Sequence, residues 1–205
     1  RADTVVTPVS CNTAVARCGA FERVRPTRIG SPYVVAAMAE EVTKGGRCVV
    51  GYEANGGFLT ATDVRIGDRV LSPLPTRDPV IVHLALLGLA RQENVPLSEL
   101  ASSLPPRFTH SDRIQGVPSE KSLALIQRLL RGGPPAVEAT FPDLGPAASL
   151  DITDGLRITF RSGEIVHIRP SGNAPELRCY TEADTAPRAA ALNRTALEKI
   201  GDVFA

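Results

Sequence analysis

The stretch Arg47-Cys48-Val49-Val50-Gly51-Tyr52-Glu53-Ala54-Asn55-Gly56-Gly57-Phe58 combines a strand pattern with a glycine-rich loop. Its first residues predict a short strand, because β-branched residues are enriched in strands, and the glycines that follow predict a loop. In α/β proteins ligands bind beyond the carboxyl ends of such strands. We therefore expect a ligand-binding loop over residues 52–58.

Strand and helix patterns alternate on both sides of this loop. A polar residue or a proline opens each helix, as N-caps and first-turn prolines do. We interpret Ser31 as the cap of the second helix and Asp78 as the cap of the longest one. Short connections between alternating elements predict an α/β sandwich with a mainly parallel sheet. The expected strands are Thr4–Val9, Glu22–Arg25 and Arg47–Tyr52, and the expected helices are residues 12–18, 31–38 and 79–92.

The second half of the chain has a different pattern. Leu104-Pro105-Pro106 cannot extend a helix, and strand patterns then predominate, with a three-residue hairpin at Arg161-Ser162-Gly163. We expect a smaller α+β domain with an antiparallel sheet, and a boundary near residues 97–106, so that residues 1–100 and 101–205 form the two domains. The expected strands are residues 107–109, 156–160, 164–168 and 177–182, the helices are 119–130 and 188–200, and the glycine- and proline-rich residues 131–148 are expected to be loop.

Composition excludes several classes of function. Of the 205 residues, 43% are hydrophobic and the net charge is +1, which predicts no nucleic-acid and no membrane partner. The four cysteines have no CxxC spacing and the three histidines are scattered, so we predict no metal site in this chain and reduced thiols in a cytoplasmic protein. The start, Arg1-Ala2-Asp3-Thr4, matches neither a signal peptide nor an initiation site, and we expect it to lie within a longer gene.

The stretch Arg169-Pro170-Ser171-Gly172-Asn173-Ala174-Pro175 combines a guanidinium, a hydroxyl, an amide and a glycine between two expected strands. Arginine binds phosphate with two parallel hydrogen bonds, and glycine lets backbone amides turn toward the same anion. The stretch is equally consistent with a tight hairpin whose Ser171 and Asn173 only satisfy the turn. Residue chemistry alone leaves these two interpretations open.

Two further positions could contact a ligand. Glu53 and Asn55 lie on a loop with glycines and could accept hydrogen bonds from neighbouring sugar hydroxyls, although a solvated glutamate at a strand corner is the simpler interpretation. Arg28 and Ser31 precede a helix and could meet a phosphate there, although plain capping by Ser31 is favoured.

Taken together, these segments resemble the α-D-phosphohexomutases, the phosphomannomutase/phosphoglucomutase family, whose third and fourth domains the chain matches in order and spacing. The resemblance implies that Arg169, Ser171, Gly172 and Asn173 hold the phosphate that is not reacting. It also implies that Glu53, Asn55, Gly56 and Arg28 bind the sugar. The family's usual sugar loop is Gly-Glu-x-Ser-Gly-His, so that here Asn55 replaces the serine and Gly57 replaces the histidine.

The family's phosphoserine segment and magnesium loop are absent from this sequence. The resemblance therefore implies no catalytic residue in this chain. It implies that the N-terminal half of the same protein is the partner of this chain and binds Mg²⁺. The implied reaction interconverts hexose 6-phosphate and hexose 1-phosphate through a hexose 1,6-bisphosphate, most simply as a phosphomannomutase. A phosphoglucomutase or a related phosphosugar mutase is the alternative within the family, and a non-catalytic phosphosugar-binding protein is the alternative of another class.

Overall fold

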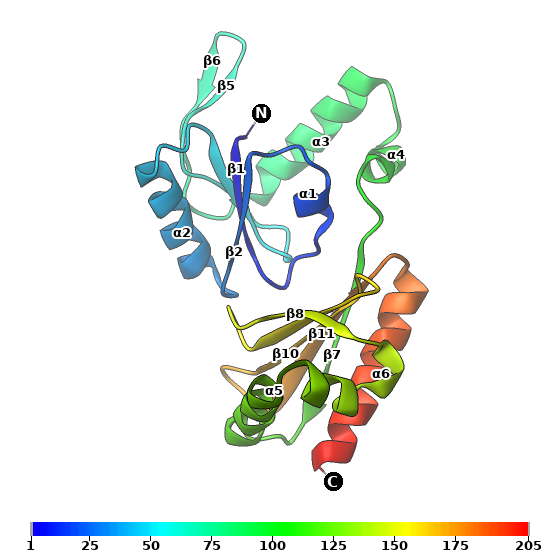
Figure 1. The fold of residues 1–205 in the computed structure, drawn as a ribbon. Helices are drawn as coiled ribbons and strands as arrows, with labels where there is room; N and C mark the ends of the chain where they lie inside the picture. The colour runs from blue at the N-terminus through cyan, green and yellow to red at the C-terminus, as the bar shows by residue number, and fades with distance from the viewer. Residues whose placement is uncertain (1, 205) are drawn as a thin grey trace. The chain divides into compact units, whose positions relative to one another are not determined.

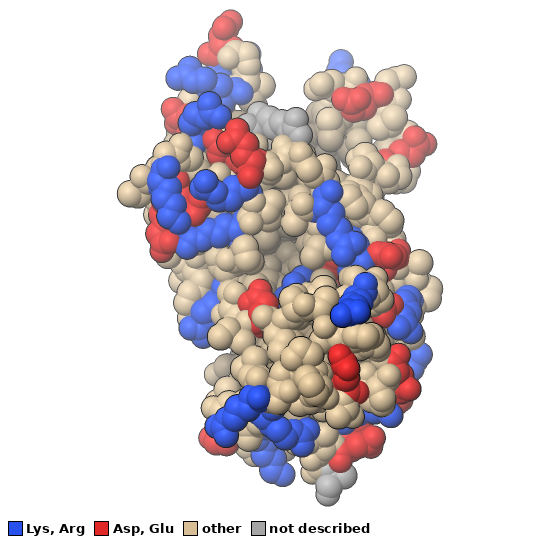
Figure 2. Space-filling view, in the orientation of Figure 1, with Lys and Arg blue, Asp and Glu red and all other residues tan. Residues whose placement is uncertain are grey.

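The computed structural model describes residues 2–204 and divides into two compact units, one ending at Pro106 and the other beginning at Arg107 (Figure 1). Each unit has its own sheet and its own hydrophobic core. Among the described residues, no helix is long and apolar enough to cross a membrane. Side chains of both charge signs lie on the visible face of each unit (Figure 2).

The first unit contains a mixed sheet with the strand order β2-β1-β3-β4. The central strand β1 pairs in parallel with β2 and β3, and only β4 runs antiparallel, so the expected mainly parallel sheet is confirmed. Its strands are β1 (Thr4–Pro8), β2 (Arg23–Thr27), β3 (Val49–Tyr52) and β4 (Phe58–Thr60). The other elements are α1 (Ala14–Arg17), α2 (Ser31–Thr43), the hairpin β5 (Val64–Ile66) and β6 (Arg69–Leu71), α3 (Pro79–Glu93), α4 (Leu97–Leu100) and a 3₁₀ turn (Ala101–Ser103).

Helix α2 covers the sheet and forms the core of the first unit. Gly51 of β3 brings the two close together, since a Cβ there would lie 2.6 Å from the Met38 sulfur and 2.8 Å from Val34 Cγ1. This core therefore depends on one small residue where the strand passes under the helix. The buried residues are Val6, Val34, Ala37, Met38, Val49 and Leu59.

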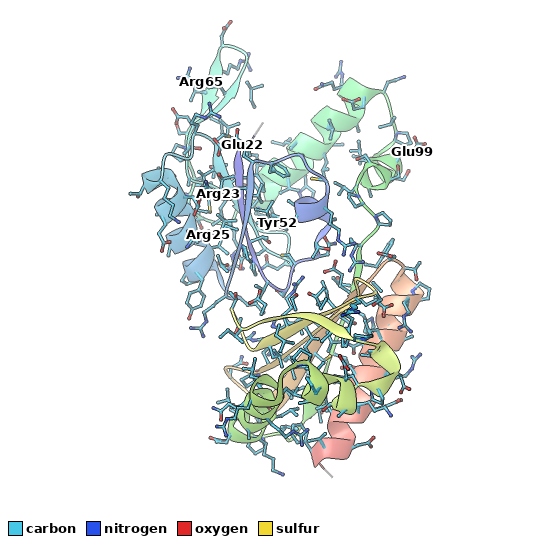
Figure 3. The ribbon with its side chains drawn as sticks, viewed as in Figure 1. Glu22, Arg23, Arg25, Tyr52, Arg65 and Glu99 are labelled. Carbon is cyan, nitrogen blue, oxygen red and sulfur yellow. The ribbon has the colours of Figure 1, made fainter. Side chains whose placement is uncertain are left out.

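Charged side chains tie α2 to the edge strand β2. Glu41 of α2 is only 1% exposed and pairs with Arg23 and Arg25 of β2, both labelled in Figure 3, and with Lys44 at 3.0 Å. These contacts lower the pKa of Glu41 to about 2, chiefly through Lys44 and Arg23. A buried carboxylate is tolerated here because several cations compensate for its lost hydration.

Of the two predicted helix caps, Asp78 is confirmed and Ser31 is wrong. The Asp78 carboxylate caps α3 as expected, accepting hydrogen bonds from the amides of Val80 at 3.0 Å and Ile81 at 3.3 Å. Ser31 does not cap α2. It is already the first helical residue, behind Gly30 with φ 132°, and its hydroxyl bonds to Glu53 instead of to a helix amide.

The second unit is an antiparallel sheet of five strands in the order β7-β11-β10-β9-β8, as expected for this half of the chain. Helices α5 and α6 cover one face of it (Figure 1). The strands are β7 (Phe108–Gln115), β8 (Ala147–Asp151), β9 (Leu156–Phe160), β10 (Ile165–Pro170) and β11 (Glu176–Ala183). The helices are α5 (Ser119–Thr140), α6 (Ala186–Phe204) and a 3₁₀ turn at Pro142–Leu144.

The expectation of a loop over residues 131–148 was wrong. Helix α5 continues to Thr140 with one break at Gly133, whose φ is 61° and ψ −153°, and β8 begins at Ala147. Pro134 and Pro135 follow the break, where they open the second helical segment and need no amide hydrogen. Burial of Val137 holds that segment on the core.

Alternation along the strands divides the second sheet into an apolar face and a polar face. Val166, Ile168, Leu177 and Cys179 point into the core under α5 and α6. The residues between them point to the opposite face, because successive side chains of a strand alternate. That polar face carries the candidate site of this unit.

Candidate functional site

The candidate sugar-binding residues lie at one edge of the first sheet. Strands β1, β2 and β3 are parallel, so their carboxyl ends meet there, with Pro8 opposite Thr27 and Val6 opposite Gly51. Arg28 follows β2 directly, and Glu53 follows β3. The topology therefore brings two polar segments together that are far apart in the sequence.

Glu53 is a buried carboxylate that its neighbours hold in place. It is 8% exposed, accepts a hydrogen bond of 2.7 Å from the Ser31 hydroxyl at Oε2, and lies 3.7 Å from Nε of Arg77 at the same oxygen. Its amide donates to the Gly57 carbonyl at 2.9 Å, which closes the loop. Burial also raises the pKa of the nearby Cys11 thiol, and the Glu53 carboxylate raises it further.

The rest of the loop is a tight turn. The Asn55 side-chain oxygen accepts a hydrogen bond of 3.0 Å from the Gly57 amide, and the Gly56 amide donates to the Glu53 carbonyl at 3.0 Å. Gly56 has φ 86°, a conformation that side chains disfavour. Asn55 and Gly56 are exposed, so they form the tip of the loop above Glu53.

Arg28 also lies at this edge, but its described contact is with an aromatic ring. The guanidinium carbon lies 4.8 Å from the centre of the Tyr33 ring. A stacked guanidinium keeps its hydrogen-bond donors at the rim and open to a ligand. No ion pair joins Arg28 to Glu53 among residues 2–204.

In the second unit, Arg169 lies near the end of β10 and is oriented by a carboxylate. Its Nε lies 3.4 Å from Oδ1 of Asp154, and the two side chains are 16% and 9% exposed. Gly155, which follows Asp154, has φ 77°, and a Cβ there would lie 2.3 Å from the Ile168 carbonyl oxygen and 2.6 Å from Arg169 Cβ. A glycine is therefore required for the Asp154 turn to approach Arg169.

The loop after Arg169 is the hairpin between β10 and β11. Ser171 is buried, its amide donates to the Glu176 carbonyl at 2.8 Å, and its hydroxyl donates to the Asn173 side-chain oxygen at 3.0 Å. Gly172 is exposed and does not have positive φ, and a Cβ there would meet nothing within 4 Å. The glycine thus leaves open space at the tip, and the Ser171 and Asn173 side chains bond to each other.

Two further arginines belong to the same face, and sequence reasoning missed them. Arg178 of β11 lies directly opposite Arg169, and Arg113 of β7 lies directly opposite Arg178. Arg178 also reaches the Asn173 side-chain oxygen at 3.4 Å. Glu176 lies 3.4 Å from Arg113 Nε and 3.8 Å from Arg178 Nε. Only the register of the antiparallel strands aligns these guanidinium groups, and spacing in the sequence does not reveal it.

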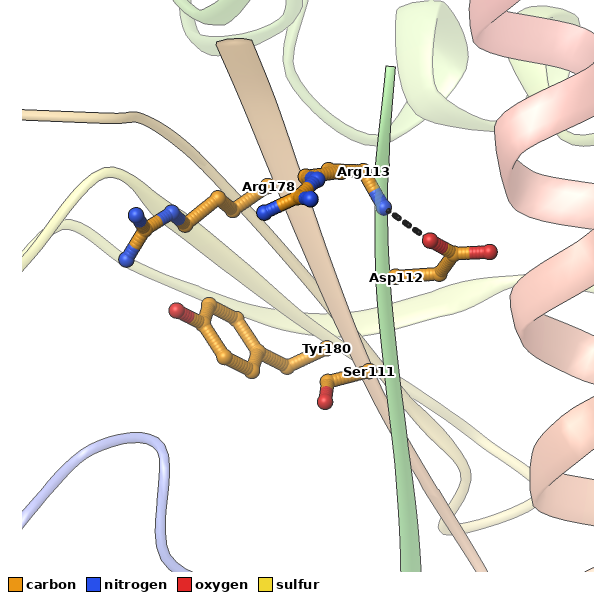
Figure 4. A pocket seen from close by; sticks show the side chains of 5 residues that line it. All are labelled: Ser111, Asp112, Arg113, Arg178 and Tyr180. Atoms are coloured by element: carbon orange, nitrogen blue, oxygen red, sulfur yellow. Dashed lines mark hydrogen bonds between the residues drawn. The ribbon is translucent and has the colours of Figure 1, made fainter. Parts of the chain in front are cut away.

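A pocket opens beside this row of arginines. Figure 4 shows Arg113 and Arg178 side by side, with the hydroxyl groups of Tyr180 and Ser111 below them. Cations and hydroxyl groups on one wall suit an anion that also carries hydroxyls. The fifth lining residue, Asp112, accepts a hydrogen bond from the Arg113 amide at 2.8 Å.

The described residues contain no group of three or more histidines, cysteines and acidic residues that could hold a metal ion. His167 packs against Tyr180, with 5.4 Å between ring centroids, and its Nε2 lies 2.5 Å from the Asp154 carbonyl. Burial lowers the pKa of His167, so at neutral pH the ring is neutral and Nε2 carries the proton toward that carbonyl.

Comparison with known proteins matches both units. Residues 1–108 match the family model described as phosphoglucomutase/phosphomannomutase, alpha/beta/alpha domain III, and residues 111–199 match that family's C-terminal domain. A phosphomannomutase of Salmonella muenchen is 42% identical over 97% of this chain and 41% of its own length. A phosphomannomutase of Sinorhizobium fredii is 43% identical over 88% of this chain and 38% of its own length.

The fold agrees with these matches. A phosphoglucomutase/phosphomannomutase family protein from Burkholderia thailandensis superimposes with a TM-score of 0.65 at 18% identity, over 97% of this chain and 37% of that one. The chain thus spans about 40% of the length of the curated relatives. Because family models cover nearly all of it, the chain belongs to the phosphoglucomutase/phosphomannomutase family, of which it contains domain III and the C-terminal domain.

Proposed function

We propose that this chain is the ligand-binding part of a phosphohexomutase, with one loop that binds phosphate and another that binds sugar hydroxyls. The observation that carries the proposal is Arg169, fixed by Asp154 beside the exposed Gly172 and in register with a second arginine. The proposal assigns phosphate binding to residues 101–205, through Arg169, Ser171, Gly172 and Asn173. It assigns sugar binding to residues 1–100, through Glu53, Asn55, Gly56 and Arg28.

The phosphate grip follows from the chemistry of the loop. A guanidinium binds a phosphate through two parallel charge-assisted hydrogen bonds, and such bonds contribute about 1.5–3 kcal/mol each. Arg169 is mostly buried and already oriented by Asp154, so little side-chain entropy is lost when it binds. Ser171 and Asn173 bond to each other without ligand and could exchange that bond for the phosphate oxygens.

The sugar grip follows from the Glu53 carboxylate. A buried acceptor in a fixed orientation favours a ligand with a hydroxyl at the matching place and disfavours one without it, because the acceptor is then left unpaired. Glu53 meets this condition, since Ser31 and Arg77 hold the carboxylate from one side.

The reaction of the whole protein extends beyond this chain. We propose the interconversion of hexose 6-phosphate and hexose 1-phosphate through a hexose 1,6-bisphosphate, in a phosphomannomutase, with phosphoglucomutase as the alternative. In this proposal Mg²⁺ and the phosphoserine belong to the remainder of a longer, cytoplasmic protein, and the residues described here bind and orient the ligand.

Calorimetric titration of the chain with mannose 6-phosphate and with inorganic phosphate tests the proposal. We expect Arg169→Ala to weaken the binding of both ligands about tenfold or more, and Glu53→Gln to weaken the binding of mannose 6-phosphate only. Arg188→Ala is the matched control, because Arg188 also pairs with a carboxylate, that of Glu164 at 2.8 Å, outside the site. If the Arg169 and Arg188 variants bind alike, the β10–β11 loop is an ordinary hairpin and the proposal fails.

A further inference from the structure

Gly57 and Gly56 are adjacent glycines with different reasons for being glycine. Gly56 has φ 86° and open space where a Cβ would be. Gly57 does not have positive φ, so its φ angle does not require a glycine. A Cβ at Gly57 would instead lie 2.6 Å from Cδ and 2.7 Å from Cγ of Arg77. Gly57 is therefore small because the stem of Arg77 lies across it.

The backbone holds Arg77 at this place. The amide of the next residue, Asp78, donates to the Phe58 carbonyl at 2.9 Å, and the Asp78 carboxylate caps α3. The Thr60 amide donates to the Leu74 carbonyl at 3.1 Å, and the Leu74 amide donates to the Thr60 hydroxyl at 2.8 Å. The segment that carries Arg77 is thus attached to β4 at both ends, and its side chain is directed onto the Glu53 loop.

Glu53 and Arg77 together leave open the groups that a ligand needs. Both contacts described for the Glu53 carboxylate, from Ser31 and from Arg77, fall on Oε2, and among the described residues no hydrogen bond to Oε1 is found. The Arg77 side chain is 54% exposed, and its Nε lies 3.7 Å from Oε2, beyond hydrogen-bond distance. The guanidinium therefore has donors available beside an available carboxylate oxygen.

We propose that Arg77 is a further substrate-binding residue of the sugar site, donating to the same ring hydroxyls that donate to Glu53. This inference rests on the proposed function. A hydroxyl has one proton and two lone pairs, so a carboxylate alone satisfies only its donor side. A guanidinium next to that carboxylate satisfies the acceptor side and offers two donors in a fixed plane, which favours a pair of neighbouring hydroxyls.

Two substitutions separate the charge of Arg77 from its packing. Arg77→Met keeps a stem over Gly57 and removes the guanidinium, and we expect about tenfold weaker binding of mannose 6-phosphate with unchanged binding of inorganic phosphate. Gly57→Ala displaces the stem, and we expect about threefold or more weaker binding. In the Arg77→Ala background the stem is absent, so adding Gly57→Ala there should cause no further loss of affinity.

The control is Arg23→Met. Arg23 is 55% exposed and pairs with the buried carboxylate of Glu41, as Arg77 does with Glu53, but it lies on β2 next to α2. We expect mannose 6-phosphate to bind Arg23→Met and the parent chain equally. Thermal unfolding of each variant shows whether it is folded before titration.

The outcomes separate this inference from the proposed function. If Glu53→Gln weakens mannose 6-phosphate and Arg77→Met does not, Arg77 only packs against the loop and the inference is overturned. Equal losses of mannose 6-phosphate and inorganic phosphate in Arg77→Met also overturn it, because they indicate a general disturbance. If neither Glu53→Gln nor Arg169→Ala changes binding, the proposed function itself has failed.

Discussion

Gly155→Ala tests how the fold positions Arg169 in the proposed phosphate-binding loop. Gly155 has φ 77°, and its Cβ would lie 2.3 Å from the Ile168 carbonyl oxygen and 3.0 Å from Arg169 Cα. Left-handed backbone at a residue with a side chain costs about 1–2 kcal/mol, and overpacking a closed contact costs about 1–3 kcal/mol. We therefore expect the free energy of unfolding of the second unit to fall by about 2–5 kcal/mol.

The substitution should also affect ligand binding. The turn that carries Asp154 must move away from β10, so the 3.4 Å contact between Asp154 and Arg169 is lost. Arg169 then becomes mobile before it binds, and we expect inorganic phosphate to bind at least several-fold more weakly. Urea unfolding followed by circular dichroism gives the stability, amide hydrogen exchange of β10 assigns the loss to this unit, and calorimetry gives the affinity.

Gly116→Ala is the matched control. Gly116 lies in the same unit with φ 74°, but a Cβ there would meet nothing within 4 Å. The free energy of unfolding of Gly116→Ala should fall only by the cost of the left-handed backbone, about 1–2 kcal/mol, and this variant should keep its affinity for phosphate. If Gly155→Ala is no less stable than Gly116→Ala and binds phosphate equally well, the close approach of the turn does not position Arg169, and the reasoning is refuted.

Two further predictions concern acid stability and turnover. Because Lys44 and Arg23 lower the pKa of Glu41 from 4.5 to about 2, its contribution to stability is complete above about pH 4.5 and is lost as the pH falls toward 2. Glu41→Gln should cost about 2 kcal/mol at pH 7, and unfolding curves should show the difference from the parent chain shrinking below pH 4; a constant difference would contradict this. The purified chain should show no mutase turnover with mannose 1-phosphate, Mg²⁺ and a hexose bisphosphate, and metal-dependent turnover free of host enzyme would contradict the proposed division of roles.

Much of the fold could be predicted because its signals are local. Strands β1, β3, β9 and β10 are runs of β-branched and apolar residues, and Asp78 caps α3 through amides two and three residues ahead. Such contacts form between neighbours in the chain, so the order of residue types specifies them. Where a local signal had two outcomes it misled: glycine and proline near residue 133 break α5 without ending it, because Val137 is buried.

The site residues stay predictions. Residues 53–57 and 169–173 drew attention as short loops with distinctive composition, and the family resemblance then implied their roles. Their sequence could not say what holds them. Ser31 carries a hydroxyl that suits a helix cap equally well, and only packing of the strand ends turns it toward Glu53 at 2.7 Å.

What tertiary structure alone decided are the partners that come from distant parts of the chain. Arg77 crosses Gly57 because the segment after β6 returns along β4, and Arg178 and Arg113 align with Arg169 because antiparallel strands pair in one register. The order of residues was enough to single out the loops that are candidates for ligand binding, since the composition of a loop depends on neighbouring residues. The structure decided which side chains surround each loop, because distances between elements depend on how their apolar faces pack.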